Sequence, residues 1–253
     1  MRHVFRMQVQ NDWANLLDIN GGTHMTGQRC IIFGASRGIG AAYAAHLSTR
    51  GDEVLSVSRT KPPLGKWIRA DLAEPAGITT VSEAVGADPI DAFLFLGGIW
   101  EAGAFTDAYE FQASPDAETR AVLSVNLIAP IELIKALLPN LKRSENPRAV
   151  FIGSLSGLEN SATPEVANTA SKFGLRGAAE AMRCVLKGQG VAVSVINPGN
   201  VETPEVIEDI ATGAFAPQVP IPMADLFAVI DCALAMSPAS EIRVLDIAQR
   251  GFE

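Results

Sequence analysis

A glycine-rich loop at 34–40 is the feature that most limits what this chain can fold into. The apolar run Cys30–Phe33 leads directly into the sequence GASRGIG, and a helical pattern comes next at Ile39–Thr49. Glycines let a backbone turn sharply and approach a phosphate, and the free N–H groups of a helix start favour an anion. A loop between the first strand and first helix of a βαβ unit is the required context. The segment therefore predicts a dinucleotide phosphate loop, with a glycine-rich turn that binds nothing as the alternative.

Strand-like and helical runs alternate along the rest of the chain. The expected strands are Cys30–Phe33, Glu53–Val57, Trp67–Ala70, Ala92–Leu96, Ala149–Ile152, Ala192–Ile196 and Glu241–Asp246. The expected helices are Ile39–Thr49, Ile78–Val85, Thr119–Leu141, Thr169–Lys187 and Met223–Met236. Several strands are apolar without polar alternation, as in parallel sheets covered on both faces. We expect an α/β fold: a single-domain, Rossmann-type, doubly wound parallel sheet of about seven strands with helices on both faces.

Composition excludes several classes of function. The formal charge is -8 and no Lys/Arg-rich run occurs, which argues against nucleic acid or an anionic membrane as partner. The three cysteines and three histidines are scattered, so neither a disulfide framework nor a metal site is expected. We see no apolar run close to the roughly 20 residues that span a bilayer, and no secretory signal. A cytoplasmic protein is the expectation.

Residues 1–24 differ in pattern from the rest of the chain, and a second methionine, Met25, precedes the first strand pattern. Two interpretations stay open: a remnant of expression or a misassigned start, and a genuine N-terminal arm with a short helix at Val9–Leu17. Neither gives the segment a catalytic role. The nucleotide-binding domain is expected to span 25–253.

The end of the second strand bears on the cofactor. NAD sites usually end this strand with an Asp or Glu that binds the ribose 2′-hydroxyl. Here the strand runs Val57-Ser58-Arg59, with no carboxylate at its tip. Arg59 and the loop residue Arg37 offer guanidinium groups suited to a 2′-phosphate. The sequence favours NADP(H), although each arginine taken alone is also an ordinary solvated side chain.

With these motifs in place, the chain resembles the short-chain dehydrogenase/reductase family over nearly its whole length after Met25. The glycine loop has the family's GxxxGxG spacing, and NPGNVET at 197–203 is similar to the loop that closes over its nicotinamide. Asn126, Ser154 and Lys172 match its catalytic asparagine, serine and lysine. Alone, Ser154 is also an ordinary strand cap and Lys172 an ordinary helix lysine.

The loop and the resemblance together define the candidate site. Cofactor binding is expected from Gly34, Ser36, Arg37, Gly38, Ile39, Gly40, Ser58, Arg59, Asp71, Leu72, Gly97, Lys172, Pro198, Gly199, Val201 and Thr203. Catalytic roles are expected for Ser154, Lys172, Asn126 and Asn168.

Two departures from the family pattern matter. The segment Phe95–Gly98 lacks the polar side chains of the family's Asn-Asn-Ala-Gly. More important, Asn168 stands where the family has its catalytic tyrosine, four residues before Lys172 and so on the same helix face. An amide has no usable proton near neutral pH, and losing a positioned general acid costs on the order of 10²–10⁴ in rate.

The retained groups suggest how a reaction would continue without the tyrosine. Ser154 and Asn168 are expected to point hydrogen-bond donors at an oxyanion. Lys172 is expected to hold the nicotinamide ribose and, with Asn126, to order a water that supplies the proton. Of the two tyrosines in the chain, Tyr43 reads as packing and Tyr109 is a second candidate to reach the substrate cleft.

Two functions stand as hypotheses. The first is an NADPH-dependent oxidoreductase that transfers hydride to a carbonyl, or a related C=X bond, of a small molecule. The second is an NADP(H)-binding pseudoenzyme with a structural or sensing role, which Asn168 motivates unless that residue is itself an introduced change. By the resemblance, Pro204–Pro222 roofs the pocket, its apolar content suggests a compact apolar substrate, and helices 119–141 and 169–187 pair subunits in a homodimer or homotetramer.

Overall fold

Seven parallel strands form one sheet in the order β3-β2-β1-β4-β5-β6-β7. The structure is a computed structural model and describes residues 27–250, so the predicted extension at 1–24 lies outside the described part. The strands are β1 (Arg29–Phe33), β2 (Glu53–Ser58), β3 (Lys66–Arg69), β4 (Ala92–Phe95), β5 (Arg148–Ile152), β6 (Ala192–Pro198) and β7 (Val244–Ile247). The predicted fold class, a doubly wound parallel sheet in a single domain, is confirmed.

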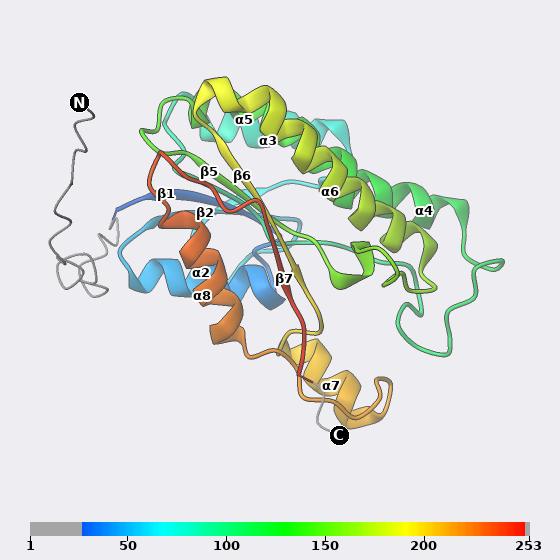
Figure 1. Ribbon diagram of the computed structural model, residues 1–253. Helices are drawn as coiled ribbons and strands as arrows, with labels where there is room; N and C mark the ends of the chain where they lie inside the picture. The colour runs from blue at the N-terminus through cyan, green and yellow to red at the C-terminus, as the bar shows by residue number, and fades with distance from the viewer. Residues whose placement is uncertain (1–26, 251–253) are drawn as a thin grey trace, which may run out of the picture.

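Helices cover both faces of the sheet (Figure 1). The helices are α2 (Gly38–Thr49), α3 (Pro75–Val85), α4 (Asp116–Leu123), α5 (Ala129–Leu141), α6 (Val166–Leu186), α7 (Pro204–Thr212) and α8 (Met223–Leu234). One face carries α3 to α6 and the other carries α2 and α8, while α7 lies apart near the C-terminus (Figure 1). Each face has its own apolar cluster, because every central strand is buried on both sides.

The strand order places a switch point between β1 and β4. From β1 the chain builds outward to β2 and β3, and it then returns to add β4 to β7 on the other side. The loops that follow the carboxyl ends of β1 and β4 therefore run in opposite directions and leave a crevice between them. Open α/β sheets bind their ligands in a crevice of this kind.

Three differences from the expected elements matter most, and the bounds of the other elements shift by at most three residues. The strand expected at Glu241–Asp246 begins only at Val244, and it is an edge strand with half-exposed residues. The helix expected over 119–141 begins at Asp116 and contains a π-helical turn at Ser124–Ile128 between α4 and α5. The segment after Thr203, expected to roof the pocket, contains the helix α7, which the sequence pattern did not indicate.

The continuous helix Asp116–Leu141 is long and apolar enough, by length and composition alone, to cross a membrane. This differs from the expectation that no apolar run approaches that length. A helix that covers the core of a globular domain passes the same test. This one packs against α3, α6 and β4.

Candidate functional site

The phosphate loop is a tight turn held against the end of β4. Gly34 has φ +86°, a left-handed conformation that suits glycine, and its N–H donates to the Val57 carbonyl at 3.0 Å. A Cβ on Gly34 would collide with the backbone of Gly97, and one on Gly40 would collide with the Gly34 carbonyl. The first turn of α2 accepts no side-chain cap, so its N–H groups face the crevice unblocked. This arrangement suits a phosphate.

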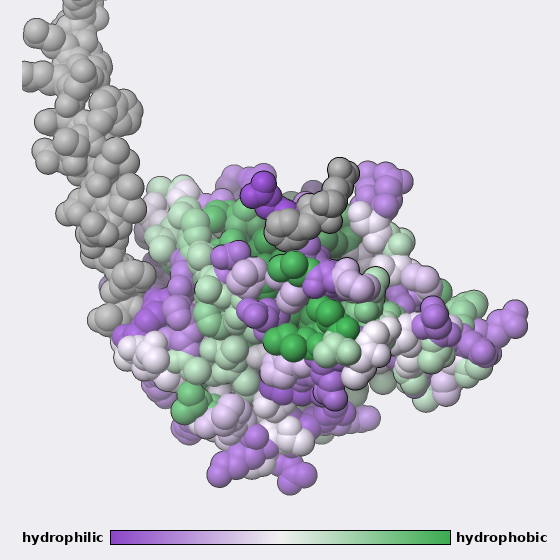
Figure 2. Space-filling model, turned by 90° about the horizontal axis from the view of Figure 1, so that it is seen from below, coloured by the Kyte–Doolittle hydropathy of each residue, from purple (hydrophilic) through white to green (hydrophobic). Residues whose placement is uncertain are grey.

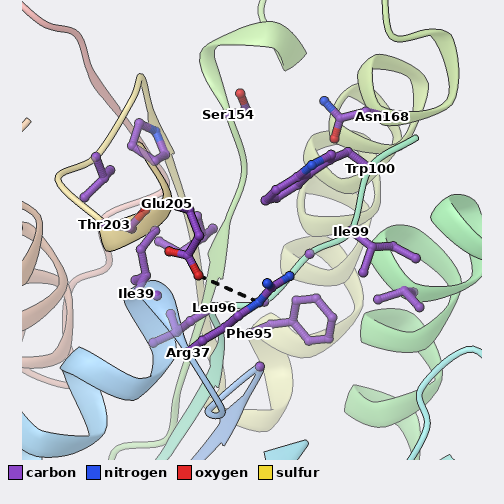
Figure 3. Close-up of a pocket in the computed structure, with 18 of the residues that line it drawn as sticks. Arg37, Ile39, Phe95, Leu96, Ile99, Trp100, Ser154, Asn168, Thr203 and Glu205 are labelled. Atoms are coloured by element: carbon purple, nitrogen blue, oxygen red, sulfur yellow. Dashed lines mark ion pairs between the residues drawn. The ribbon is translucent and has the colours of Figure 1, made fainter. Parts of the chain in front are cut away.

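The ends of β2 and β3 carry the residues predicted to contact the adenosine half of a cofactor. Ser58 is buried and donates its hydroxyl to the Thr60 carbonyl at 2.7 Å, while Arg59 is exposed. Asp71 accepts from the Ala73 N–H at 3.1 Å, which fixes the turn after β3. Arg37 extends from the loop and pairs with Glu205 of α7, with 3.9 Å between Nε and Oε1 (Figure 3).

One cavity of about 360 Å³ brings most of the predicted site together. Its walls include Gly34, Ser36, Arg37, Gly38, Ile39, Ser58, Arg59, Asp71, Leu72, Gly97, Ser154, Asn168, Lys172, Pro198, Gly199, Val201 and Thr203. Two predicted residues lie outside the lining: Gly40 packs beneath the loop, and Asn126 lies behind the wall.

Asn126 has a structural task beside the predicted one. Its side chain accepts from the Ile99 N–H at 2.9 Å and donates to the Ile99 carbonyl at 2.7 Å. It also donates to Ser171 Oγ at 3.1 Å. Both N–H groups of the amide are thus engaged by protein, while its oxygen keeps a second lone pair that can accept from water, so the predicted ordering of a water stays a prediction. Asn126 pins the loop after β4 to the helix behind it.

Ser154 comes directly after β5 and faces the cavity. Its Oγ accepts from the Ser156 N–H at 3.2 Å and from the Ser156 hydroxyl at 3.0 Å. Because both of these bonds use the oxygen as acceptor, the hydroxyl proton of Ser154 is free to be donated to a ligand. In Figure 3 Ser154 and Asn168 lie at the same end of the cavity.

Lys172 lies one helical turn after Asn168 on α6, and only 9% of it is exposed. Its Nζ donates to the Ile152 carbonyl at 3.1 Å, and within the described chain no carboxylate forms an ion pair with it. Burial lowers the pKa of this ammonium from 10.5 to about 8. A buried lysine with this pKa can give up a proton near neutral pH.

Asn168 is 3% exposed, and its backbone groups form hydrogen bonds within the protein. Its N–H and that of Ala167 donate to Glu101 Oε1 at 3.2 and 2.7 Å, and its carbonyl accepts from Ser171. Within residues 27–250 the hydrogen bonds of Asn168 all involve its backbone, and the residue lines the cavity. The amide is therefore available to a ligand.

The loop at 197–203 is tied to the C-terminal strand. Asn197 donates to Asp246 at 2.8 Å, and the Gly199 N–H donates to the Ile247 carbonyl at 2.8 Å. Thr203 Oγ1 accepts from the Val206 N–H at 3.3 Å and so begins α7. Figure 2 views the molecule from the side on which α7 lies and shows hydrophobic side chains grouped near the middle of this face among polar ones.

The aromatic lining after β4 was missed by the sequence analysis. Trp100 and Phe105 form an aromatic wall with Phe215. Phe215, Glu205 and Asp209 come from the segment expected to roof the pocket, and they line the cavity. The available signal for the rest was the presence of Trp100 and Phe105 within eight residues after Gly97.

Neither tyrosine lines the cavity. Tyr43 is fully buried and donates to Asp231 at 2.7 Å, which confirms packing, and burial raises its pKa. Tyr109, which the sequence left open as a candidate for the substrate cleft, does not reach it; its hydroxyl oxygen accepts from the Val166 N–H at 3.2 Å. No group of three or more potential metal-ligating side chains occurs in the described chain.

Comparison with known proteins adds to this geometry. The family model for short chain dehydrogenases matches residues 28–212. Ketoacyl reductase HetN of Nostoc sp. strain PCC 7120 is 31% identical over 207 residues, which cover 76% of this chain and 70% of that protein. The 3-oxoacyl-[acyl-carrier-protein] reductase FabG of Escherichia coli K12 is 27% identical over 190 residues, covering 70% and 75% of the two chains.

Among solved structures, a metagenomic short-chain oxidoreductase in complex with NADP superposes with a TM-score of 0.70. The match covers 90% of this chain and 99% of that one at 24% identity, and therefore speaks to the fold alone. The family model and the two curated relatives, in contrast, match this chain in sequence. The chain belongs to the short-chain dehydrogenase/reductase family of oxidoreductases.

Proposed function

We propose that this protein is an NADP(H)-dependent oxidoreductase that interconverts a carbonyl and an alcohol on a small molecule. The observation that carries the proposal is one cavity lined by both the phosphate loop and the Ser154–Asn168–Lys172 group. One end of the cavity suits a dinucleotide, and the other has two hydrogen-bond donors and an acid. The family's chemistry needs these two parts side by side.

The residues present fit a dinucleotide. The backbones of Gly34 and Gly97 approach so closely that neither residue could carry a side chain, which keeps the loop bare, and the start of α2 presents N–H groups with no side-chain cap. Bound NADPH would supply hydride to the carbonyl carbon. The Asn197–Thr203 loop and Lys172 would orient the nicotinamide end, and α7 would limit the access of water.

Arg37 and Arg59 support NADP(H) over NAD(H). Both line the cavity, and β2 ends without a carboxylate that would bind a free 2′-hydroxyl and repel a phosphate. An exposed guanidinium offers two parallel donors to a phosphate. The NADP complex of the structurally similar oxidoreductase is consistent with this preference.

Lys172 takes the tyrosine's part as proton source in this proposal. As the carbonyl carbon gains hydride, its oxygen becomes an alkoxide, which Ser154 and Asn168 stabilise by donating hydrogen bonds. The Lys172 ammonium gives a proton to that oxygen, directly or through one water, and solvent later reprotonates the amine. A pKa of about 8 places this group in the range in which a general acid works well.

Equilibrium binding and turnover test the proposal together. Titration of the protein with NADPH and NADH, followed by cofactor fluorescence, should show at least tenfold tighter binding of NADPH. Loss of absorbance at 340 nm is then measured with a panel of ketones and aldehydes. Tight NADPH binding with no turnover of any carbonyl would refute the enzyme and leave a cofactor-binding pseudoenzyme.

Self-association is part of the same proposal. Large apolar side chains stay exposed on the covering helices, at Ile128, Ile131, Val166 and Phe173. Burying them against a second copy would remove this surface from water. We propose a homodimer or homotetramer through α4, α5 and α6 in the cytoplasm, and sedimentation should find no monomer at micromolar concentration. A monomer would refute this part.

A further inference from the structure

The loop after β4 carries aromatic side chains into the cavity. Trp100 and Phe105 meet edge to face with 5.9 Å between ring centroids, and Phe105 meets Phe215 at 6.4 Å and 89°. All three line the cavity, and Figure 3 shows Trp100 beside Asn168 and on the same side as Ser154. Trp100 is 52% exposed, which is a large apolar surface to leave in water. Such a surface beside the candidate reacting groups indicates a binding surface.

Three buried side chains fix this loop in place. Asn126 pairs with both backbone groups of Ile99. Glu101, 2% exposed, accepts from the N–H groups of Ala167 and Asn168 at the start of α6. The loop is thus tied to the helix that carries Asn168 and Lys172.

Glu165 supplies the third tie. It is 2% exposed, and its Oε1 accepts from the Phe105 N–H at 2.7 Å. Phe105 has φ +66°, a left-handed conformation that is strained for a residue with a side chain. Strain of this kind persists where surrounding contacts over-determine the backbone, and it concentrates at functional sites. Here the buried carboxylate holds the strained residue so that its ring faces Trp100 and Phe215.

Charge narrows the ligand further. Two acids of α7 line the cavity: Glu205 lies at the phosphate loop, where it pairs with Arg37, and Asp209 lies next to the aromatic wall, where its carbonyl accepts from the Phe215 N–H at 2.9 Å. A ligand carboxylate or phosphate at the aromatic wall would be repelled by the Asp209 carboxylate. An uncharged ring would bury the exposed aromatic surface without this penalty.

We propose that Trp100, Phe105 and Phe215 form a preorganised aromatic subsite that selects uncharged aryl carbonyl compounds, with the carbonyl oxygen at Ser154 and Asn168. The reaction of these compounds depends on the proposed function, whereas the binding of their ring to the subsite does not. Glu165 is a positioning residue: it touches Phe105 and not the substrate. A wall fixed before binding costs little entropy to use, so the ring preference should be strong.

The test compares matched ketones and matched variants. Acetophenone should have a KM at least fivefold below that of cyclohexyl methyl ketone and of 4-carboxyacetophenone. Trp100→Ala should raise the KM of acetophenone at least fivefold more than it raises the KM of butanone, and should leave the Kd of NADPH unchanged. Phe111→Ala is the control, because Phe111 is a 64% exposed aromatic of the same segment that does not line the cavity.

Glu165 tests the positioning. Glu165→Gln keeps an acceptor oxygen for the Phe105 N–H and should retain the KM of acetophenone, whereas Glu165→Ala should raise it several-fold with kcat for butanone preserved. Equal effects of the two variants on both ketones would overturn this role. Thermal unfolding of each variant separates a local effect from general misfolding.

A binding arm keeps the two proposals apart. Saturation-transfer NMR measures binding of 1-phenylethanol to the protein with NADP⁺ added, with and without Trp100→Ala. Ring binding that depends on Trp100 in a protein that turns over nothing would uphold the subsite and refute the enzyme. Turnover without any ring preference, unchanged by Trp100→Ala, would refute the subsite and uphold the enzyme.

Discussion

Replacing Lys172 with methionine should make the unliganded protein more stable while removing its activity. Methionine has a similar length and no charge, so it fills the same space without a buried ammonium. Burial lowers the pKa of Lys172 from 10.5 to about 8. Because one pKa unit equals about 1.4 kcal/mol, the charged lysine costs on the order of 3 kcal/mol of folding stability at neutral pH. This cost is what the substitution relieves.

The hydrogen bond to the Ile152 carbonyl partly offsets the gain. Its loss costs about 1 kcal/mol, which leaves a net increase of about 2 kcal/mol in the free energy of unfolding. For a domain of this size that corresponds to a rise of about 4–8 °C in Tm. Urea unfolding at pH 7 measures the difference directly.

The direction of the pKa shift determines how the free energy of unfolding changes with pH. The folded pKa of Lys172 lies below its unfolded value, so between about pH 8 and 10.5 the unfolded wild type binds more protons, and wild-type stability rises with pH. The advantage of Lys172→Met should therefore be full below pH 8 and about 2 kcal/mol smaller at pH 9.5. Two results would refute the claim that Lys172 is buried in its charged form. One is a variant less stable than wild type at pH 7, and the other is a difference in free energy of unfolding that does not change with pH.

Four further changes test other contacts. Asn168→Tyr restores a phenol beside Lys172 and should raise kcat by on the order of 10²-fold, and an unchanged rate in steady-state assays would mean that the site lacks other parts. Arg59→Asp should raise the Kd of NADPH at least tenfold and that of NADH little; equal changes by fluorescence titration would remove Arg59 from the 2′-phosphate. Glu205→Gln frees Arg37 from its ion pair and should tighten NADPH binding a few-fold at low salt, whereas weaker binding would show that Glu205 assists the cofactor. Arg148→Met leaves the carbonyls of Met236, Ser237 and Ser240 without their guanidinium donor and should cost about 2–4 kcal/mol by urea unfolding, against a cost near zero if water replaces it.

The fold was predictable because the buried parallel strands are short segments that are apolar on both faces. Segments with helical periodicity separate one such strand from the next. Cys30–Phe33 and Ala149–Ile152 illustrate this pattern, and the structure places these two expected strands inside β1 and β5. The edge strand was misplaced because its half-exposed residues carry a weaker signal, and β7 ends at Ile247 rather than Asp246.

The site was predictable where a motif fixes backbone geometry, as at Gly34, and less so where distant segments converge. Phe215 meets Phe105 across 110 positions of sequence, and only the folded chain brings them together. The lowered pKa of Lys172 depends on burial and on the absence of an ion pair in the described structure, and neither can be read from its neighbours in sequence. The hydrogen bonds of Asn126 to Ile99 were not foreseen either, because the motif indicates the residue type and not the backbone groups that it meets in the fold.

Isotope transfer tests most directly whether a cavity without the tyrosine still performs hydride chemistry. NADPH carrying deuterium at both hydrogen positions of C4 of the nicotinamide is mixed with excess protein and acetophenone in a single turnover, and the alcohol is examined by mass spectrometry. We predict one deuterium on the carbinol carbon, with a transfer rate that falls as the pH rises through about 8, where Lys172 loses its proton. Bound NADPH that transfers no deuterium to this or any other carbonyl compound at any pH would contradict an oxidoreductase built on Ser154, Asn168 and Lys172.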